Sequence, residues 1–399
     1  MRLSMTQDKE MNGRERILAA FRGESADTVP FAINIYLWFY YHKYRGSLPA
    51  AIAHMQHPFE VLRYLGADIL ARWDTQWALR EVYTAGEYSE EYSGHGDLNE
   101  VRTTAFHHWP PRMTERRQQF VTPYGTLTQR WAFTPETGAD FEAEHWWKEW
   151  REYDAVRFML ENKEFAFDAA LFDHWVEQVG DDGVTMLNLS ESPLKRLHWL
   201  AGPANASLFM MDHPEEMKAL AKIHEEKALK FLAQVVDHPK AEVFISHDNL
   251  DSAFYPPYFY RDYCESFFTR AAEMIHARGK TLVVHACGRN KALLKHIGRS
   301  QVDCLEGITP PPLGDVNLGL VRETVGYDRF TVDGGMDTAH LEVKADAEQV
   351  IHTYTRGLFK SMGDKRHFIF ASSCMTPPPT PWENIVAFRD AAREYGRID

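Results

Sequence analysis

Residues 241–248 read AEVFISHD and residues 280–288 read KTLVVHACG, and each is a short apolar run that ends abruptly in polar residues. The segment between them includes Tyr260–Arg278, whose apolar residues have the spacing of an amphipathic helix. A strand, a helix and a second strand in this order are typical of a parallel pair, because a parallel crossover needs a long connection. The stretch therefore predicts a βαβ unit.

The same alternation continues on both sides of this unit. Further strand-like runs occupy 184–190, 301–307, 328–335 and 366–374, and amphipathic stretches occupy Pro214–Val236, Lys291–Arg299, Ala345–Met362 and Trp382–Tyr395. Two upstream runs, TVPFAINIY (28–36) and ADILARWD (67–74), would complete a set of eight strands. Continuous apolar strands alternating with helices indicate an α/β protein, and eight such units predict a closed (β/α)8 or TIM barrel.

Residues 99–134 interrupt this rhythm. They contain an alternating pattern, TLTQRWAFT, directly after the turn signal TPYG. Such a pattern predicts antiparallel strands, so we expect an inserted β segment that forms a lid near the barrel mouth. The βα alternation around it predicts one domain spanning residues 1–399.

Composition excludes several classes of function. The chain has 399 residues with 44% hydrophobic and 25% charged content, as in soluble enzymes, and its formal net charge is -13. An acidic chain without clustered Lys and Arg is a poor partner for nucleic acid. The sequence contains neither an apolar run of membrane-spanning length nor a hydrophobic signal segment in its opening MRLSMTQDKE, which predicts a cytoplasmic protein with no membrane partner.

Residues that follow the strand-like runs are the candidates for chemistry, since the carboxyl ends of barrel strands form the active site. His285 and Cys287 are two apart on an extended segment, so both side chains point to the same side, while Glu306 and Cys374 follow two other runs. Nitrogen, thiolate and carboxylate donors of this kind favour zinc, so we predict a site formed by these four residues. Cys304 lies inside an apolar run and is expected in the core.

His247 and Asp248 end another strand-like run. They are candidates to protonate or orient a leaving atom, and the alternative is that they satisfy each other within a loop.

With these residues in view, the chain resembles the uroporphyrinogen decarboxylase superfamily. The opening NGRERILAAFRGESADTVPF contains the pattern R-G-x-x-x-D-x-V-P, and HACG is followed far downstream by Cys374 and TPPPTPWENI. More narrowly, the His-x-Cys pair and the distant cysteine resemble the zinc-dependent methyltransferase branch, which includes corrinoid-linked enzymes.

The resemblance implies zinc at the barrel mouth on His285, Cys287 and Cys374, with Glu306 matching a glutamate that binds zinc in relatives. It also implies methyl transfer to or from cobalamin. The chain has no D-x-H-x-x-G pattern of an attached cobalamin module, so we expect a separate corrinoid protein or free cobalamin as partner.

The aromatic stretch after the first predicted strand, INIYLWFYYHKYRG, favours a methoxylated aromatic substrate and hence O-demethylation. Asn34, Tyr36 and Trp38 are the predicted substrate-binding residues, and core packing is the competing interpretation of the aromatic rings. Methanol, methylamines, halomethanes and thiols remain open as methyl donors. Because the stretch lacks the basic pattern with which porphyrinogen decarboxylases hold carboxylates, tetrapyrrole decarboxylation is the second interpretation, and a non-catalytic corrinoid-binding barrel is the third.

Overall fold

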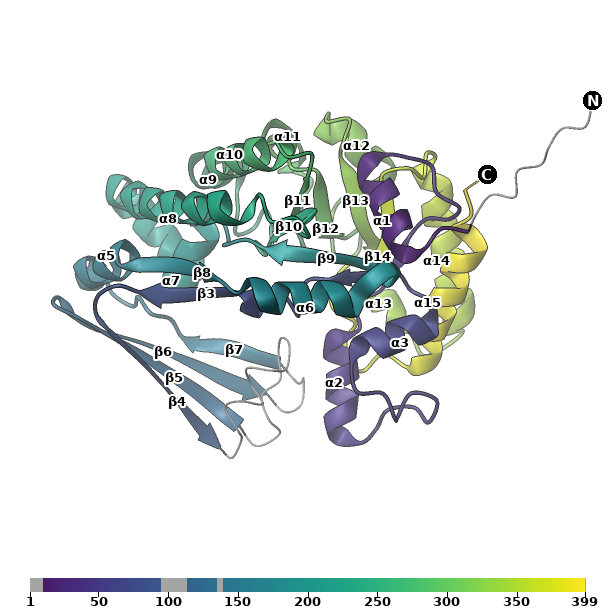
Figure 1. Cartoon of the computed structure of the whole chain (residues 1–399), viewed down its shortest axis with the longest axis horizontal. Coiled ribbons are helices and arrows are strands. Elements are labelled where there is room, and N and C mark those ends of the chain that lie inside the picture. The colour runs from purple at the N-terminus through teal and green to yellow at the C-terminus, as the bar shows by residue number, and fades with distance from the viewer. Residues whose placement is uncertain (1–9, 95–112, 135–138, 399) are drawn as a thin grey trace, which may run out of the picture.

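A parallel barrel forms the body of the protein in the computed structural model, which describes residues 10–94, 113–134 and 139–398 (Figure 1). The strands follow one another in the order β1-β14-β13-β12-β11-β10-β9-β2, and every pair is parallel. Their bounds are β1 (Phe31–Ala32), β2 (Ile69–Ala71), β9 (Gly183–Asn188), β10 (Val243–Ser246), β11 (Thr281–His285), β12 (Cys304–Ile308), β13 (Thr331–Met336) and β14 (Phe368–Ser372). This confirms the predicted (β/α)8 barrel, and each strand lies within its predicted run or extends one residue beyond it.

One aspartate closes the barrel between β1 and β2. The backbone amide of Asp68 donates to the carbonyl of Phe31 at 2.7 Å, and the amide of Phe31 donates to the Asp68 carboxylate at 2.9 Å. Arg16 on α1 (Gly13–Arg22) forms an ion pair with the same carboxylate and with Asp27. The opening sequence motif therefore joins the first helix to the strands at which the barrel closes.

Two hydrophobic cores lie on opposite sides of the barrel strands. The inner core fills the barrel with small and branched side chains and is completed by Ile17, Ala20 and Phe21 of α1. Cys304 belongs to this inner core, as expected. The larger outer core lies between the strands and the surrounding helices. Burial on both faces explains why the strands read as continuous apolar runs.

Helices cover the outside of the barrel (Figure 1). The predicted helical stretches correspond to α8, the pair α9 and α10, α11, α14 and α15. The bounds are α6 (Ala169–Val179), α7 (Pro193–Asp212), α8 (Pro214–Val235), α9 (Pro257–Tyr263), α10 (Glu265–His276), α11 (Leu294–Arg299), α12 (Leu318–Val325), α13 (Thr338–Leu341), α14 (Ala347–Met362) and α15 (Trp382–Tyr395). Within the described ranges, no helix is long and apolar enough to cross a membrane.

The aromatic stretch after β1 is helical. It forms α2 (Tyr36–Arg45), which begins four residues after the last residue of β1 and is followed by α3 (Pro58–Leu65). The side chains of Tyr36, Trp38, Phe39 and Tyr40 are all buried. The residues expected to form a substrate chamber are thus part of the outer core.

An antiparallel sheet is inserted between β2 and β9. Its strands are β4 (Glu87–Gly94), β5 (Met113–Thr122), β6 (Gly125–Thr134) and β7 (Ala139–Glu144), and it lies to one side of the barrel (Figure 1). A two-stranded ribbon of β3 (Leu79–Tyr83) and β8 (Lys163–Phe167) flanks it, with α5 (Tyr153–Glu161) following β7 in sequence. The predicted insertion at 99–134 includes β5 and β6, while residues 99–112 lie outside the described residues. The insertion is longer than predicted on both sides.

Candidate metal centre and cavity

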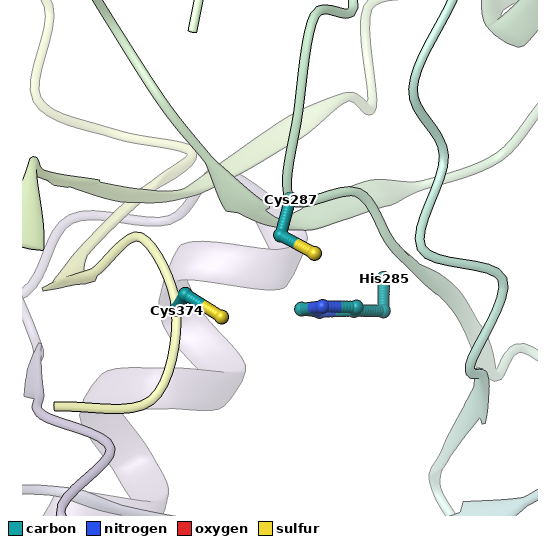
Figure 2. Close-up of side chains that lie close together, drawn as sticks. All are labelled: His285, Cys287 and Cys374. Atoms are coloured by element: carbon teal, nitrogen blue, oxygen red, sulfur yellow. The ribbon is translucent and has the colours of Figure 1, made fainter. Parts of the chain in front are cut away.

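A histidine and two cysteines from two strand ends converge at the carboxyl end of the barrel. One ligand atom of each of His285, Cys287 and Cys374 lies within 4.8 Å of the other two. Figure 2 shows both sulfur atoms and the imidazole ring directed toward one another. Three of the four predicted metal ligands are thus brought together, although Cys287 and Cys374 are 87 positions apart in the sequence.

The local sequence explains how the first two side chains are placed. His285 is the last residue of β11, and Cys287 follows in an extended turn. A Cβ atom at Gly288 would lie 2.3 Å from the Asp251 carboxylate, so this glycine permits a close approach between two loops. Asn290 then fixes the loop, since its amide group donates to the carbonyl of Leu250 at 2.7 Å.

Cys374 follows β14 and is linked electrostatically to Cys287. The hydrogen bond between the two sulfur atoms is the main reason that the pKa of Cys374 is lowered to about 6, and His285 contributes further. The same hydrogen bond, together with burial, raises the pKa of the Cys287 thiol. One thiolate therefore forms readily, and a cation is required for both to exist together.

Glu306 is placed differently from the prediction. Its carboxylate accepts a hydrogen bond from Nδ1 of His285 on one side and forms an ion pair with Arg72, 2.6 Å away, on the other. It does not join the three-residue cluster, and it holds the imidazole so that Nε2 is the nitrogen left for a ligand. Although burial opposes its ionisation, Arg72 and His285 lower the pKa of Glu306 to about 2. Glu306, predicted as a direct ligand, is thus a hydrogen-bond partner of His285 and lies outside the cluster, an arrangement that is common around metal sites.

A second carboxyl group lies beside Glu306. Asp333 on β13 is paired in register with Glu306 and is fully buried. Among the described residues its two oxygens have no hydrogen-bond partner. Burial and the negative charge of Glu306 raise the pKa of Asp333 well above its usual range.

The His247 and Asp248 side chains belong to different environments. His247 lines the same cavity as the cluster, and its ring stacks on Trp73 with a centroid distance of 4.7 Å. Burial lowers its pKa to about 3, and neither ring nitrogen has a partner among the described residues. The Asp248 carboxylate instead accepts from Ser192 and from the Ser246 hydroxyl, fully buried behind the strand. The structure thus places the predicted catalytic residue His247 in the cavity wall, whereas the carboxylate of the other, Asp248, is held by Ser192 and Ser246.

Of the three predicted substrate-binding residues, the structure places only Asn34 in the cavity wall. Its amide nitrogen and oxygen are buried without a hydrogen-bond partner among the described residues. The Tyr36 hydroxyl donates to Asp74, and the Trp38 indole donates to the carbonyl of Thr380 at 2.8 Å. Both side chains are used in packing α2, so their predicted contact with substrate is not supported.

The cavity beside the cluster has a volume of about 750 Å³. Its walls come from the carboxyl ends of the barrel strands, from α7 and from the inserted sheet. The aromatic side chains of these walls are Trp73, Trp77, Tyr83, Tyr88, Tyr92, Trp131, Trp146, Phe165 and Trp199. Charged side chains also line it, namely Glu81, Arg116, Asp140, Glu142, Glu191, Lys195 and Arg196. The cavity has the size and the mainly apolar walls of a small-molecule site.

Some of these cavity residues could have been identified from the sequence. Arg72 and Trp73 directly follow β2, so the rule applied to the other strand ends would also have selected them. The contributions of α7 and the inserted sheet carried no such signal, because their positions over the barrel depend on long-range packing.

Two sulfur atoms and an imidazole beside a cavity are a donor set that fits zinc, since three protein ligands leave a fourth position for another molecule. Cysteine donors disfavour magnesium and calcium, which prefer oxygen. The fold and site define a (β/α)8 barrel protein whose His-Cys-Cys cluster could hold a soft metal ion at the barrel mouth.

Comparison with known proteins agrees with this class. The family model described as "Uroporphyrinogen decarboxylase (URO-D)" matches residues 132–395, and the chain belongs to this family. Among solved structures, a methyltransferase from Methanosarcina mazei has a similar fold, with a TM-score of 0.59 and 15% sequence identity over 97% of this chain and 99% of that chain. No curated protein sequence matches the chain significantly. The resemblance noted in the sequence is thereby confirmed.

Proposed function

We propose that this protein is a zinc-dependent methyltransferase that moves a methyl group between a small methylated substrate and cobalamin. The observation that carries the proposal is the convergence of His285, Cys287 and Cys374 within 4.8 Å at the wall of a cavity. Family membership and the fold shared with a methyltransferase support it. We expect the cobalamin to be bound to a separate corrinoid protein or to be free.

The substrate that this cavity suits best is a methoxylated aromatic compound, so the reaction would be an O-demethylation. The aromatic character expected from the sequence is present in the cavity, although it comes from Trp73, Trp77 and the inserted sheet rather than from α2. Flat rings bind well between aromatic side chains, because such pairs combine apolar burial with favourable ring geometry.

In this reaction the C–O bond of the ether breaks, and the methyl group bonds to cobalt of cob(I)alamin, which supplies the electron pair. The oxygen retains the bonding pair and takes up a proton. Bound zinc would supply a Lewis acid that stabilises the departing oxygen. His285, Cys287 and Cys374 would hold the metal, and Glu306 would fix the orientation and the proton position of the His285 ring.

His247 is the residue best placed to contact the departing oxygen or its proton. It lines the cavity near His285, with 6.3 Å between the ring centroids, and its nitrogens are otherwise unused among the described residues. Because burial lowers its pKa to about 3, the ring is neutral at pH 7 and can donate a hydrogen bond from one nitrogen.

Metal analysis and a cobalamin assay test the proposal. We expect about one zinc per chain in the purified protein, lost in Cys374→Ala and His285→Ala but retained in Cys304→Ala, whose thiol lies in the inner core. Methoxylated aromatics, methanol, methylamines and thiols should then be screened with cob(I)alamin while the cobalt spectrum is followed. Absence of zinc, or full methyl transfer by Cys374→Ala, would contradict the proposal, and release of carbon dioxide from a porphyrinogen would favour decarboxylation.

A further inference from the structure

Lys195 places an ammonium group without a carboxylate partner among the described residues in the cavity wall. Lys195 is the third residue of α7 and lines the same cavity as the His285, Cys287 and Cys374 cluster. Its ammonium group lies over the ring of Trp199, one turn further along the helix, at 5.4 Å from the ring centroid. Trp199 also lines the cavity, so the charge and the aromatic surface are presented side by side.

The Lys195 ammonium has no ion pair or hydrogen bond with any residue that the structure describes. The carboxylates that act on it from a distance are each bound elsewhere. Glu191 pairs with Arg196, Asp248 accepts from two serine hydroxyls, and Glu142 accepts from the side chain of Gln129 at 2.7 Å. Arg196 also pairs with Glu81, so its charge is already compensated, and the third cation of the wall, Arg116, lies over the ring of Trp131.

Lys195 is also half-buried, and this burial lowers its pKa. An ammonium group that has lost part of its water without gaining a carboxylate is at an energetic disadvantage. An anionic ligand atom within hydrogen-bond distance would remove that disadvantage. The positive charge of Lys195 would then be compensated only when an anionic ligand occupies the cavity.

We propose that Lys195 binds the carboxylate of an aromatic carboxylic acid whose ring lies between the aromatic walls of the cavity. The inference rests on the proposed function, since it assigns the substrate class of the same cavity. Two observations carry it, namely the uncompensated ammonium in the wall and the indole rings beside it. Neutral methoxylated rings would fit the same walls but would leave the ammonium unpaired.

The test compares an acid with its neutral isostere, using 4-methoxybenzoate and 4-methoxybenzamide as probes. Binding is measured by calorimetry and by quenching of tryptophan fluorescence, with zinc-loaded protein and with protein treated with a chelator. A hydrogen bond to a charged group contributes roughly 1.5 to 3 kcal/mol, so the wild type should bind the acid about tenfold or more tightly than the amide. Lys195→Met should lose this preference, with the affinity for the amide unchanged, and Lys195→Arg should retain most of it.

Lys222→Met is the matched control, because this lysine is exposed on α8 and pairs only weakly with Glu226, at 3.9 Å. It should bind both probes as the wild type does. Lys195→Gln provides a second neutral variant if Lys195→Met does not fold. A wild type without preference for the acid, or a preference that survives in both neutral variants, would overturn the assignment.

Binding of these probes does not require methyl transfer. If methyl transfer fails while Lys195→Met still loses the preference for the acid, the proposed function is wrong and the anion site stands. If methyl transfer occurs but Lys195→Met still prefers the acid, the proposed function stands and the anion site at Lys195 is wrong. A preference for the acid that persists in the chelator-treated protein shows that the carboxylate does not bind only to zinc.

Discussion

The buried ion pair of Arg72 and Glu306 should contribute to the free energy of unfolding of the protein. The two side chains are 5% and 1% exposed, and their closest nitrogen and oxygen atoms are 2.6 Å apart. Removing one member of a buried ion pair costs about 3 to 5 kcal/mol, because the other charge is left without compensation. We therefore expect Arg72→Met to lower the free energy of unfolding by about 3 kcal/mol.

The pKa of Glu306 gives an independent magnitude. The value falls from 4.5 to about 2 in the folded protein, which corresponds to about 3 kcal/mol. Since the folded pKa is lowered, this stability is fully present above the unfolded value near 4.5 and is lost as the pH falls toward 2. Glu306→Gln should therefore make unfolding less dependent on pH between about 5 and 2.

Denaturation by urea at pH 7 and at pH 3 measures both effects in the metal-free protein. The double variant Arg72→Met/Glu306→Gln should be more stable than the sum of the single changes predicts, because it leaves no unpaired charge. Arg157→Met is the control, since its pair with Glu161 is exposed to solvent and should contribute little to stability. An Arg72→Met variant that loses no more stability than this control would refute the reasoning.

Three further results are expected. Glu306→Gln should weaken zinc binding about 10-fold to 100-fold, as judged by competition with a chelating dye, because the carboxylate that orients His285 is lost; unchanged affinity would count against this role. Gly307→Ala should lower the melting temperature, because Gly307 has a φ of +87° and an added Cβ would lie 2.8 Å from the carbonyl oxygen of Ser373 and 3.0 Å from the His285 ring; an unshifted melting curve would contradict this. Tyr36→Phe should cost about 1 to 3 kcal/mol of stability, since the Asp74 carboxylate loses a buried donor, and should leave the affinity for 4-methoxybenzoate unchanged; a weaker affinity would restore Tyr36 to the binding site.

The barrel could be predicted from sequence because each strand carries its own local signal. Parallel strands buried on both faces are continuous apolar runs, and the amphipathic stretches between them mark the helices. The position of the metal cluster followed from the same pattern, since strand ends of a barrel meet on one face. His285, Cys287 and Cys374 lie at or just after the ends of β11 and β14, so this rule predicts that they converge.

His247 and Asp248 show that following a strand does not by itself place a side chain in the cavity. Asp248 follows the strand VFIS just as His247 does, but neighbouring residues of an extended segment point to opposite sides. Only His247 therefore reaches the cavity, and Asp248 binds Ser192 at the start of α7. This outcome follows from alternation alone and could have been predicted.

The role of Glu306 could not be predicted in the same way, because it depends on Arg72. The two residues are 234 positions apart, and β2 and β12 lie four places apart in an order of eight strands. Arg72 thus reaches Glu306 across the barrel, and its charge compensates the carboxylate. Whether a glutamate at a strand end can bind a metal directly, or instead holds another side chain, depends on whether an arginine such as Arg72 pairs with it. That contact is determined by the order of the strands in the barrel.

The charges in and around the barrel interior also bear on the proposed chemistry. Arg72 and Glu306 compensate each other, and burial together with the charge of Glu306 raises the pKa of Asp333 well above its usual range. Two thiolates would likewise balance a divalent ion on the cluster. Lys195 adds a positive charge without an ion-pair partner among the described residues at one point of a cavity wall that also carries four carboxylates. At that point an anionic group of the proposed substrate would be attracted, and the negative charge that develops on a departing oxygen would not be opposed.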